Sequence, residues 1–231
     1  MVSKASVKTA PKTVVEKLTG DESLAEQAYH LIEDAIVTLR LQPGQPISEA
    51  DLSRLLAIGR TPVREAVQKL AADGLIQIYP RRGLLIPSLS VEDMTSVIET
   101  RAPLERIIVG HAARRGSDED RQQLAKLGVM MNEAGHKSEI TAYIRRDKEI
   151  DSLVNRMSRA RYAVKAAEPL KVISRRFWYF HWRNDDLVAA VECHLRIVDA
   201  IVNLDDVAAR DASDELMAHL QSSLSGLRPG I

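Results

Sequence analysis

Residues 58–70 of the chain read IGRTPVREAVQKL, which is the pattern of a short helix entered through a tight turn. Thr61 suits the N-cap, and Pro62 suits the first helical position. Arg60 and Arg64 lie four residues apart and therefore share one face of the helix. The opposite face carries an apolar stripe of Val63, Ala66, Val67 and Leu70. A helix anchored on one side, with guanidinium groups near its start, suits the major groove of DNA.

The sequence before this helix favours that interpretation over the alternative, a capped surface helix with solvated arginines. Apolar residues follow a helical period over residues 24–39, and a Pro-Gly pair then ends that helix. Ser48 and Asp51 have the spacing of a capping box at the start of a second, short helix. A short link leads from there to the helix that bears Arg64. Two short helices joined by so tight a turn predict a helix-turn-helix.

A β-hairpin is expected directly after these helices. Two short β-prone runs, residues 75–79 and 84–86, flank a basic turn at 80–83. Arg81 and Arg82 would then lie at the tip, where they either protect a sheet edge or contact phosphate or the minor groove. Three helices and this hairpin predict a winged helix-turn-helix domain over residues 21–87.

The totals exclude some classes of protein. The 231 residues include 32 basic and 32 acidic side chains, so any DNA binding must come from a local patch. Residues 1–20 contain four lysines and no signal-peptide core, which predicts a flexible basic tail. No apolar run approaches the roughly 18 residues of a membrane span. Cys193 has no cysteine to pair with in the chain, which fits a reducing cytoplasm.

The rest of the chain, residues 88–231, has no strand signal and predicts an all-α domain. Six helical patterns cover 91–115, 118–133, 138–157, 162–182, 186–202 and 207–227. Short breaks between them favour an antiparallel bundle. The expected fold is therefore mostly α, with a winged helix-turn-helix followed by a bundle of about six helices.

The first domain resembles the GntR family of transcription regulators, in the FadR-like branch whose C-terminal FCD domain senses a ligand. Motifs at residues 29–36, 41–44, 52–56, 60–66, 73–75 and 80–83 carry the resemblance. It implies a homodimer on a near-palindromic, double-stranded operator, without membrane partners. It also implies DNA contacts from Arg60, Thr61, Arg64, Arg81, Arg82 and Gly83. Ala57 and Gly59 depart from the family's usual Gly and Ser or Thr, and the lost hydroxyl removes one expected phosphate contact.

The second domain resembles FCD more loosely, and the resemblance implies a metal site. Asp147 matches the first ligand and His194 the third, while His219 is a candidate for the fourth. Asp151 stands where the family usually has His. Two carboxylates with imidazole suit Zn, Mn, Ni or Mg. The alternatives are an organic ligand pocket without metal, and aspartates solvated on a charged helix face.

Three further residues are candidates for binding an effector. Family members often use the arginine at Arg101 for an anion, because its fork matches a carboxylate. The alternative for Arg101 is a salt bridge to Glu105 on the same helix. Trp178 lies in an aromatic-rich stretch, residues 175–183, and suits either the effector cavity or the bundle core.

These observations predict a transcription regulator, and most simply a repressor, controlled by a small carboxylate-bearing metabolite. A metal-dependent enzyme that uses Asp147, Asp151 and His194 is the alternative from another class. A DNA-binding protein with a degenerate pocket is a third. We expect no enzyme, since the chain has no evident nucleophile, phosphate loop or clearly placed general base.

Overall fold

The structure is a computed structural model that describes residues 22–81, 83–181, 184–225 and 227. The predicted tail at 1–20 and the wing residue Arg82 lie outside this part. The described chain forms nine helices and a three-stranded sheet, so the predicted mostly α fold is confirmed. No described helix is long and apolar enough to cross a membrane.

The N-terminal domain contains three helices: α1 (Leu24–Val37), α2 (Glu49–Leu56) and α3 (Arg60–Ala72). The predicted capping box starts α2, because the Ser48 side chain accepts from the Asp51 backbone and Asp51 accepts in return from the Ser48 N–H. Ser23 and Glu26 form the same arrangement at α1. These caps fix where each helix begins, and the apolar stripes then pack α1 and α2 against α3.

The wing is a small antiparallel sheet with strand order β1-β3-β2. Its strands are β1 (Pro46–Ile47), β2 (Gln77–Tyr79) and β3 (Gly83–Leu85). The sequence pattern predicted the β2–β3 hairpin but not β1, because two residues are too short to show a strand period. Ile47 pairs with Leu84, and this pairing ties the wing to the segment that precedes α2.

The C-terminal domain is a bundle of six helices. They are α4 (Val91–Arg115), α5 (Asp118–His136), α6 (Ile140–Ser158), α7 (Arg161–His181), α8 (Asn184–Val202) and α9 (Asp206–Leu224). The predicted ranges agree with these bounds to within a few residues at each described end. α4 packs against α6, α7, α8 and α9 and is therefore the central helix.

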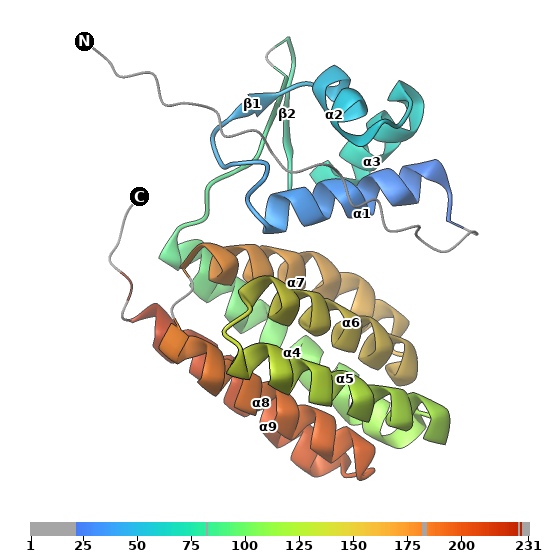
Figure 1. Cartoon of the computed structure of the whole chain (residues 1–231), viewed down its shortest axis with the longest axis vertical. Helices are drawn as coiled ribbons and strands as arrows, with labels where there is room; N and C mark the ends of the chain where they lie inside the picture. Colours follow the sequence, from blue (N-terminus) through green and yellow to red (C-terminus); the bar gives the residue numbers. More distant parts are fainter. Residues whose placement is uncertain (1–21, 82, 182–183, 226, 228–231) are drawn as a thin grey trace.

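The two domains contact each other through α1 and α7, which lie along one another in Figure 1. Lys148 on α6 reaches across and places its Nζ 2.6 Å from Oε1 of Glu33 on α1. Arg176 on α7 donates to the carbonyl of Pro87, in the segment that links the domains. Glu33 and Arg176 are both buried, so polar contacts as well as apolar ones join the domains.

Candidate functional site

The helix predicted to read DNA forms, but it starts earlier than expected. α3 begins at Arg60, and Gly59 is its N-cap without a side-chain bond, so the placement of Thr61 as N-cap is wrong. Ala57 adopts a left-handed conformation with φ 54° and ends α2 directly after Leu56, which is where the sequence pattern ends it. Pro62 is consequently the third helical residue, where its missing N–H is harmless because the first four N–H groups lack helical partners. The predicted apolar stripe is buried.

The opposite face of α3 presents its polar side chains to solvent. Arg60, Thr61 and Arg64 are all exposed. Arg64 Nε lies 3.1 Å from Oε2 of Glu49 on α2, in an ion pair whose arginine side chain is 62% exposed. An ion pair of this exposure contributes little to stability. It leaves Arg64 available for an incoming phosphate or guanine, and the predicted DNA contacts on α3 stay predictions.

The wing turn places Arg81 at an exposed position with a φ of 65°. Gly83, predicted as a DNA contact, also has a local structural role. Its φ is 90°, and a Cβ added there would lie 2.9 Å from the Ile47 carbonyl oxygen. Only glycine fits both requirements.

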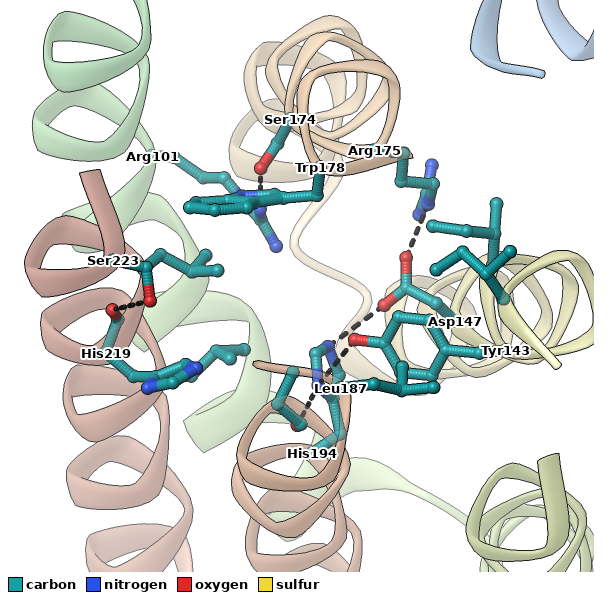
Figure 2. Close-up of a pocket in the computed structure, with 15 residues that line it drawn as sticks. Arg101, Tyr143, Asp147, Ser174, Arg175, Trp178, Leu187, His194, His219 and Ser223 are labelled. Atoms are coloured by element: carbon teal, nitrogen blue, oxygen red, sulfur yellow. Dashed lines mark hydrogen bonds and ion pairs between the residues drawn. The ribbon is translucent and has the colours of Figure 1, made fainter. Parts of the chain in front are cut away.

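The bundle contains a partly open cavity of about 60 Å³ between α4, α6, α7, α8 and α9 (Figure 2). Five predicted site residues line it: Arg101, Asp147, Trp178, His194 and His219. The remaining two, Glu105 and Asp151, line a smaller neighbouring cavity that also touches Arg101 and His194. The structure therefore brings all the predicted metal and effector residues into one region. The volume holds roughly four waters, or a ligand of a few heavy atoms.

A continuous chain of ion pairs connects these residues. His194 Nε2 lies 3.0 Å from Asp147 Oδ1, and Arg175 Nε lies 2.6 Å from Asp147 Oδ2. Arg175 also donates through Nη2 to Asp151. The chain thus runs from α8 through α6 to α7, and Figure 2 shows its first part, with Asp147 between His194 and Arg175.

Lys171 extends the chain from α7 to α4. Its Nζ lies 2.7 Å from Asp151 Oδ1 and 3.1 Å from Glu105 Oε2. Glu105 in turn accepts from Arg101 Nε at 2.7 Å. Arg101 Nη1 donates to Ser174 Oγ at 3.1 Å. The predicted alternative for Arg101, a salt bridge to Glu105, is therefore the contact that the structure contains, while Nη2 has no protein partner among the described residues.

Burial makes these pairs electrostatically strong. Burial alone would raise the pKa of Asp147, but the Arg175 guanidinium and His194 hold that pKa far below its ordinary value. Burial also opposes the charged form of Lys171, yet Asp151 and Glu105 raise the pKa of its ammonium. Each charge in the network is thus maintained by its neighbours, since an unpaired charge at this depth would be costly.

His194 is held at both ring nitrogens. Its Nδ1 lies 2.7 Å from the Ala190 carbonyl oxygen and 3.4 Å from the Tyr143 hydroxyl. A carbonyl only accepts, so Nδ1 carries a proton, and a proton on Nε2 then suits the Asp147 carboxylate. Burial opposes the charged imidazole, but the hydrogen bond and charge of Asp147 raise the pKa of His194.

The predicted set of four metal ligands is not assembled. The described residues contain no group of three or more His, Cys, Asp and Glu placed to hold a metal ion. Asp151 faces Lys171 and Arg175 instead, and its carboxylate is already bonded to two cations. Only Asp147 and His194 approach each other as two ligands of one ion would. The residues present do not fit a divalent metal centre in this arrangement, and metal binding itself stays a prediction.

Sequence reasoning missed the α7 side of the site, namely Lys171, Ser174 and Arg175. A signal was present. Lys171 and Arg175 are four residues apart, as are Asp147 and Asp151, so two facing helices present complementary pairs. Trp178, considered either cavity or core, lines the cavity and has a buried Nε1 without a partner.

Comparisons with known proteins identify both domains. Residues 24–86 match the family of bacterial regulatory proteins described as gntR family, and residues 96–221 match the FCD domain. The chain belongs to the GntR family. Its second domain is an FCD domain, which implies ligand sensing, and the protein is a transcription regulator with a helix-turn-helix DNA-binding domain.

Relatives of this GntR-family protein cover nearly its whole length. The HTH-type transcriptional repressor RspR of Escherichia coli K12 is 26% identical over 220 residues, which are 94% of this chain and 95% of RspR. The Nta operon transcriptional regulator of Aminobacter aminovorans is 26% identical over 80% of this chain and 85% of its own. E. coli McbR/YncC has the same fold, with a TM-score of 0.77 at 20% identity over 88% of this chain and 98% of that one.

Proposed function

We propose that this protein is a homodimeric repressor that binds a near-palindromic operator and releases it when a small carboxylate enters the bundle cavity. The observation that carries the proposal is the pair of free donors at that cavity. Trp178 Nε1 is buried without an acceptor, and Arg101 Nη2 has no acceptor among the described residues. A buried donor such as Trp178 Nε1 is rarely left unpaired in native proteins. A bound carboxylate would accept from both.

The rest of the cavity fits a small anion. Its other lining combines apolar side chains from α6, α8 and α9 with polar ones, and the charged groups Asp147 and Arg175 are already paired with each other. Arg101 is fixed by Glu105 and Ser174, so it is oriented before a ligand arrives. A preoriented guanidinium loses little conformational entropy when it binds a carboxylate. The small volume favours a ligand of a few heavy atoms over a long-chain one.

DNA binding would use the exposed face of α3 and the wing. Arg60 and Arg64 are exposed and would contact guanine or phosphate, and the first turn of α3 would offer its N–H groups to a phosphate. A two-fold dimer would place two such helices in successive major grooves, which is why we propose a near-palindromic site.

The contacts between the domains offer a route from the cavity to the DNA-binding domain. Asp147 lines the cavity, and the next residue, Lys148, pairs with Glu33 on α1. A ligand that prefers one position of α6 or α7 would therefore also bias how the DNA-binding domain docks. The effect is limited to the ligand's preference between the two arrangements.

Thermal unfolding in the presence of small mono- and dicarboxylates tests this function. We expect one class of acid to raise the melting temperature and weaken binding to an operator selected from random DNA. Trp178→Phe keeps the aromatic ring and removes only the Nε1 donor, and we expect it to weaken the acid about 10-fold. Tyr162→Phe, which removes a hydroxyl from an exposed ring on the same helix, is the matched control. Stabilisation that is equal in wild type and Trp178→Phe would contradict the proposed subsite.

A further inference from the structure

The clearest disagreement between this chain and its family resemblance lies between α6 and α7. We infer that the sensing cavity works without a metal ion, because the Arg175 guanidinium occupies the position between Asp147 and Asp151 that a divalent cation would need. The inference deepens the proposed function by assigning the cavity's cation to the protein itself. Its ligand would then be an organic anion bound directly by side chains.

The geometry of Arg175 carries the first step. Its Nε lies 2.6 Å from Asp147 Oδ2, and its Nη2 donates to Asp151 Oδ2. One planar side chain therefore bridges the two carboxylates that would otherwise be the anionic metal ligands. Arginine is suited to this role, because its charge is permanent and its donors have a fixed fork geometry. Arg175 is itself buried, so water does not weaken the bridge.

The balance of charge carries the second step. The network contains three permanent or nearly permanent cations and three carboxylates. The cations are Arg101, Lys171 and Arg175, and the carboxylates are Glu105, Asp147 and Asp151. These six charges sum to zero before any ion is added, and His194, which pairs with Asp147, makes the sum positive whenever its imidazole is protonated. A divalent metal would bring two further positive charges into a buried site with no uncompensated carboxylate to receive them.

The remaining candidate ligands carry the third step. His194 directs Nε2 at Asp147 and Nδ1 at the Ala190 carbonyl. Asp151 accepts from Lys171 as well as from Arg175. His219 lines the cavity on α9, but the described residues do not bring it into a group of three ligands. Zinc sites use three or four protein ligands, and only the Asp147–His194 pair approaches that arrangement.

The test measures metal rather than repression. Wild-type protein, purified without a chelator or a metal-affinity tag, is assayed by inductively coupled plasma mass spectrometry. Thermal unfolding is then repeated with Zn²⁺, Mn²⁺, Ni²⁺ or Mg²⁺ alone. We expect less than about 0.1 metal per chain and a melting temperature shifted by less than about 1 °C. A metal content near one per chain that is lost in Asp147→Asn would overturn the inference.

A variant designed to bind Zn²⁺ tests the same inference, because it removes the guanidinium that is inferred to exclude the metal. Asp151→His/Arg175→Gln removes the bridging cation and places an imidazole one turn from Asp147. We expect this variant to bind Zn²⁺ and to rise in melting temperature by several degrees when Zn²⁺ is added. Arg106→Gln, at an exposed ion pair on α4, is the control. If the double variant fails to fold, the metal content of the wild-type protein still tests whether the cavity binds a metal.

These outcomes are separable from the proposed function. A metal-free protein that no carboxylate stabilises would retain the inference and contradict the proposed effector class. A protein that carries a metal and also responds to a carboxylate would retain the effector class and contradict the inference.

Discussion

Arg175 and Arg176 are consecutive in α7, yet they connect different parts of the protein. Arg175 bridges Asp147 and Asp151 beside the bundle cavity, whereas Arg176 donates to the Pro87 carbonyl in the interdomain segment. Both side chains are buried. Because neighbouring residues of a helix move together, a shift of α7 at the cavity would also change the Arg176–Pro87 contact.

Arg176→Gln should therefore separate ligand binding from DNA release. We expect the variant to bind both operator and ligand, while the ligand's effect on operator affinity falls to less than about 3-fold. Allosteric coupling energies of 1–3 kcal/mol correspond to about 5–150-fold in a coupled protein. Fluorescence anisotropy with and without ligand measures this. Lys165→Gln, exposed on the same helix, serves as the control, and equal coupling in all three proteins would remove Arg176 from the route.

The Glu33–Lys148 ion pair predicts a dependence of stability on pH. Glu33 is buried against His30 on its own helix, Lys148 on α6 and the charge of Arg175 on α7. Burial opposes its ionised form, but His30 and Lys148 hold the pKa of Glu33 at about 2, below its ordinary value of 4.5. Its contribution to stability is therefore present above about pH 4.5 and is lost as the pH falls toward 2.

Glu33→Gln should destabilise the protein at pH 7 by about 1–2 kcal/mol, because Lys148 is partly exposed and solvent screens the pair. The difference from wild type should shrink as the pH is lowered from 5 to about 3. Urea unfolding at several pH values measures it. Asp34→Asn, in an exposed pair with Arg40, should change stability by no more than about 0.5 kcal/mol. A difference between Glu33→Gln and wild type that stays constant with pH would contradict the assignment.

Arg64→Ala should lower operator affinity and relax sequence preference at one base pair of each half-site. The expected loss is about 1–3 kcal/mol per contact, since a bidentate arginine–guanine pair has that discrimination. Glu49→Gln should instead strengthen binding modestly, because it frees Arg64 and removes a negative charge near the phosphates. Competition binding with single-base operator variants tests both, and unchanged affinity and specificity in Arg64→Ala would exclude its predicted role.

Ala57→Gly should stabilise the DNA-binding domain. Ala57 is exposed and has a φ of 54°, in the left-handed region where a Cβ is unfavourable. Glycine at such a C-cap relieves about 1 kcal/mol of strain. The greater conformational entropy of glycine in the unfolded chain offsets part of this gain. Ala71→Gly, in the last turn of α3 and without a left-handed φ, should instead destabilise by up to about 1 kcal/mol. Calorimetry that finds both substitutions destabilising would contradict this reading of the turn.

Much of the fold could be predicted from local sequence. Helical periods and the Ser48–Asp51 capping box are local signals, and the structure retains both. The Pro-Gly pair does not itself end α1, since the helix stops at Val37 and the chain turns at the left-handed Leu39. The start of α3 could not be placed correctly, because its N-cap is Gly59, which has no side chain to signal a cap. β1 could not be predicted from the sequence, because its two residues form a strand only through their pairing with β3.

The residues of the candidate site could be predicted from the sequence, but the ion pairs that they form could not. Asp147, His194 and Arg101 were placed together through family resemblance, and the structure gathers them at one cavity. What Asp151 contacts depends on the register between α6 and α7, which is set by packing rather than by local sequence. The bridging role of Arg175 therefore became visible only in three dimensions.

A crystal structure of untreated protein, with anomalous data collected at the zinc, nickel and manganese edges, tests the cavity most directly. We predict the Arg175 guanidinium between Asp147 and Asp151, no anomalous peak within bonding distance of Asp147, and any bound small anion on Arg101 and Trp178 Nε1. An anomalous peak between Asp147 and His194, with Arg175 turned away from both aspartates, would contradict the account.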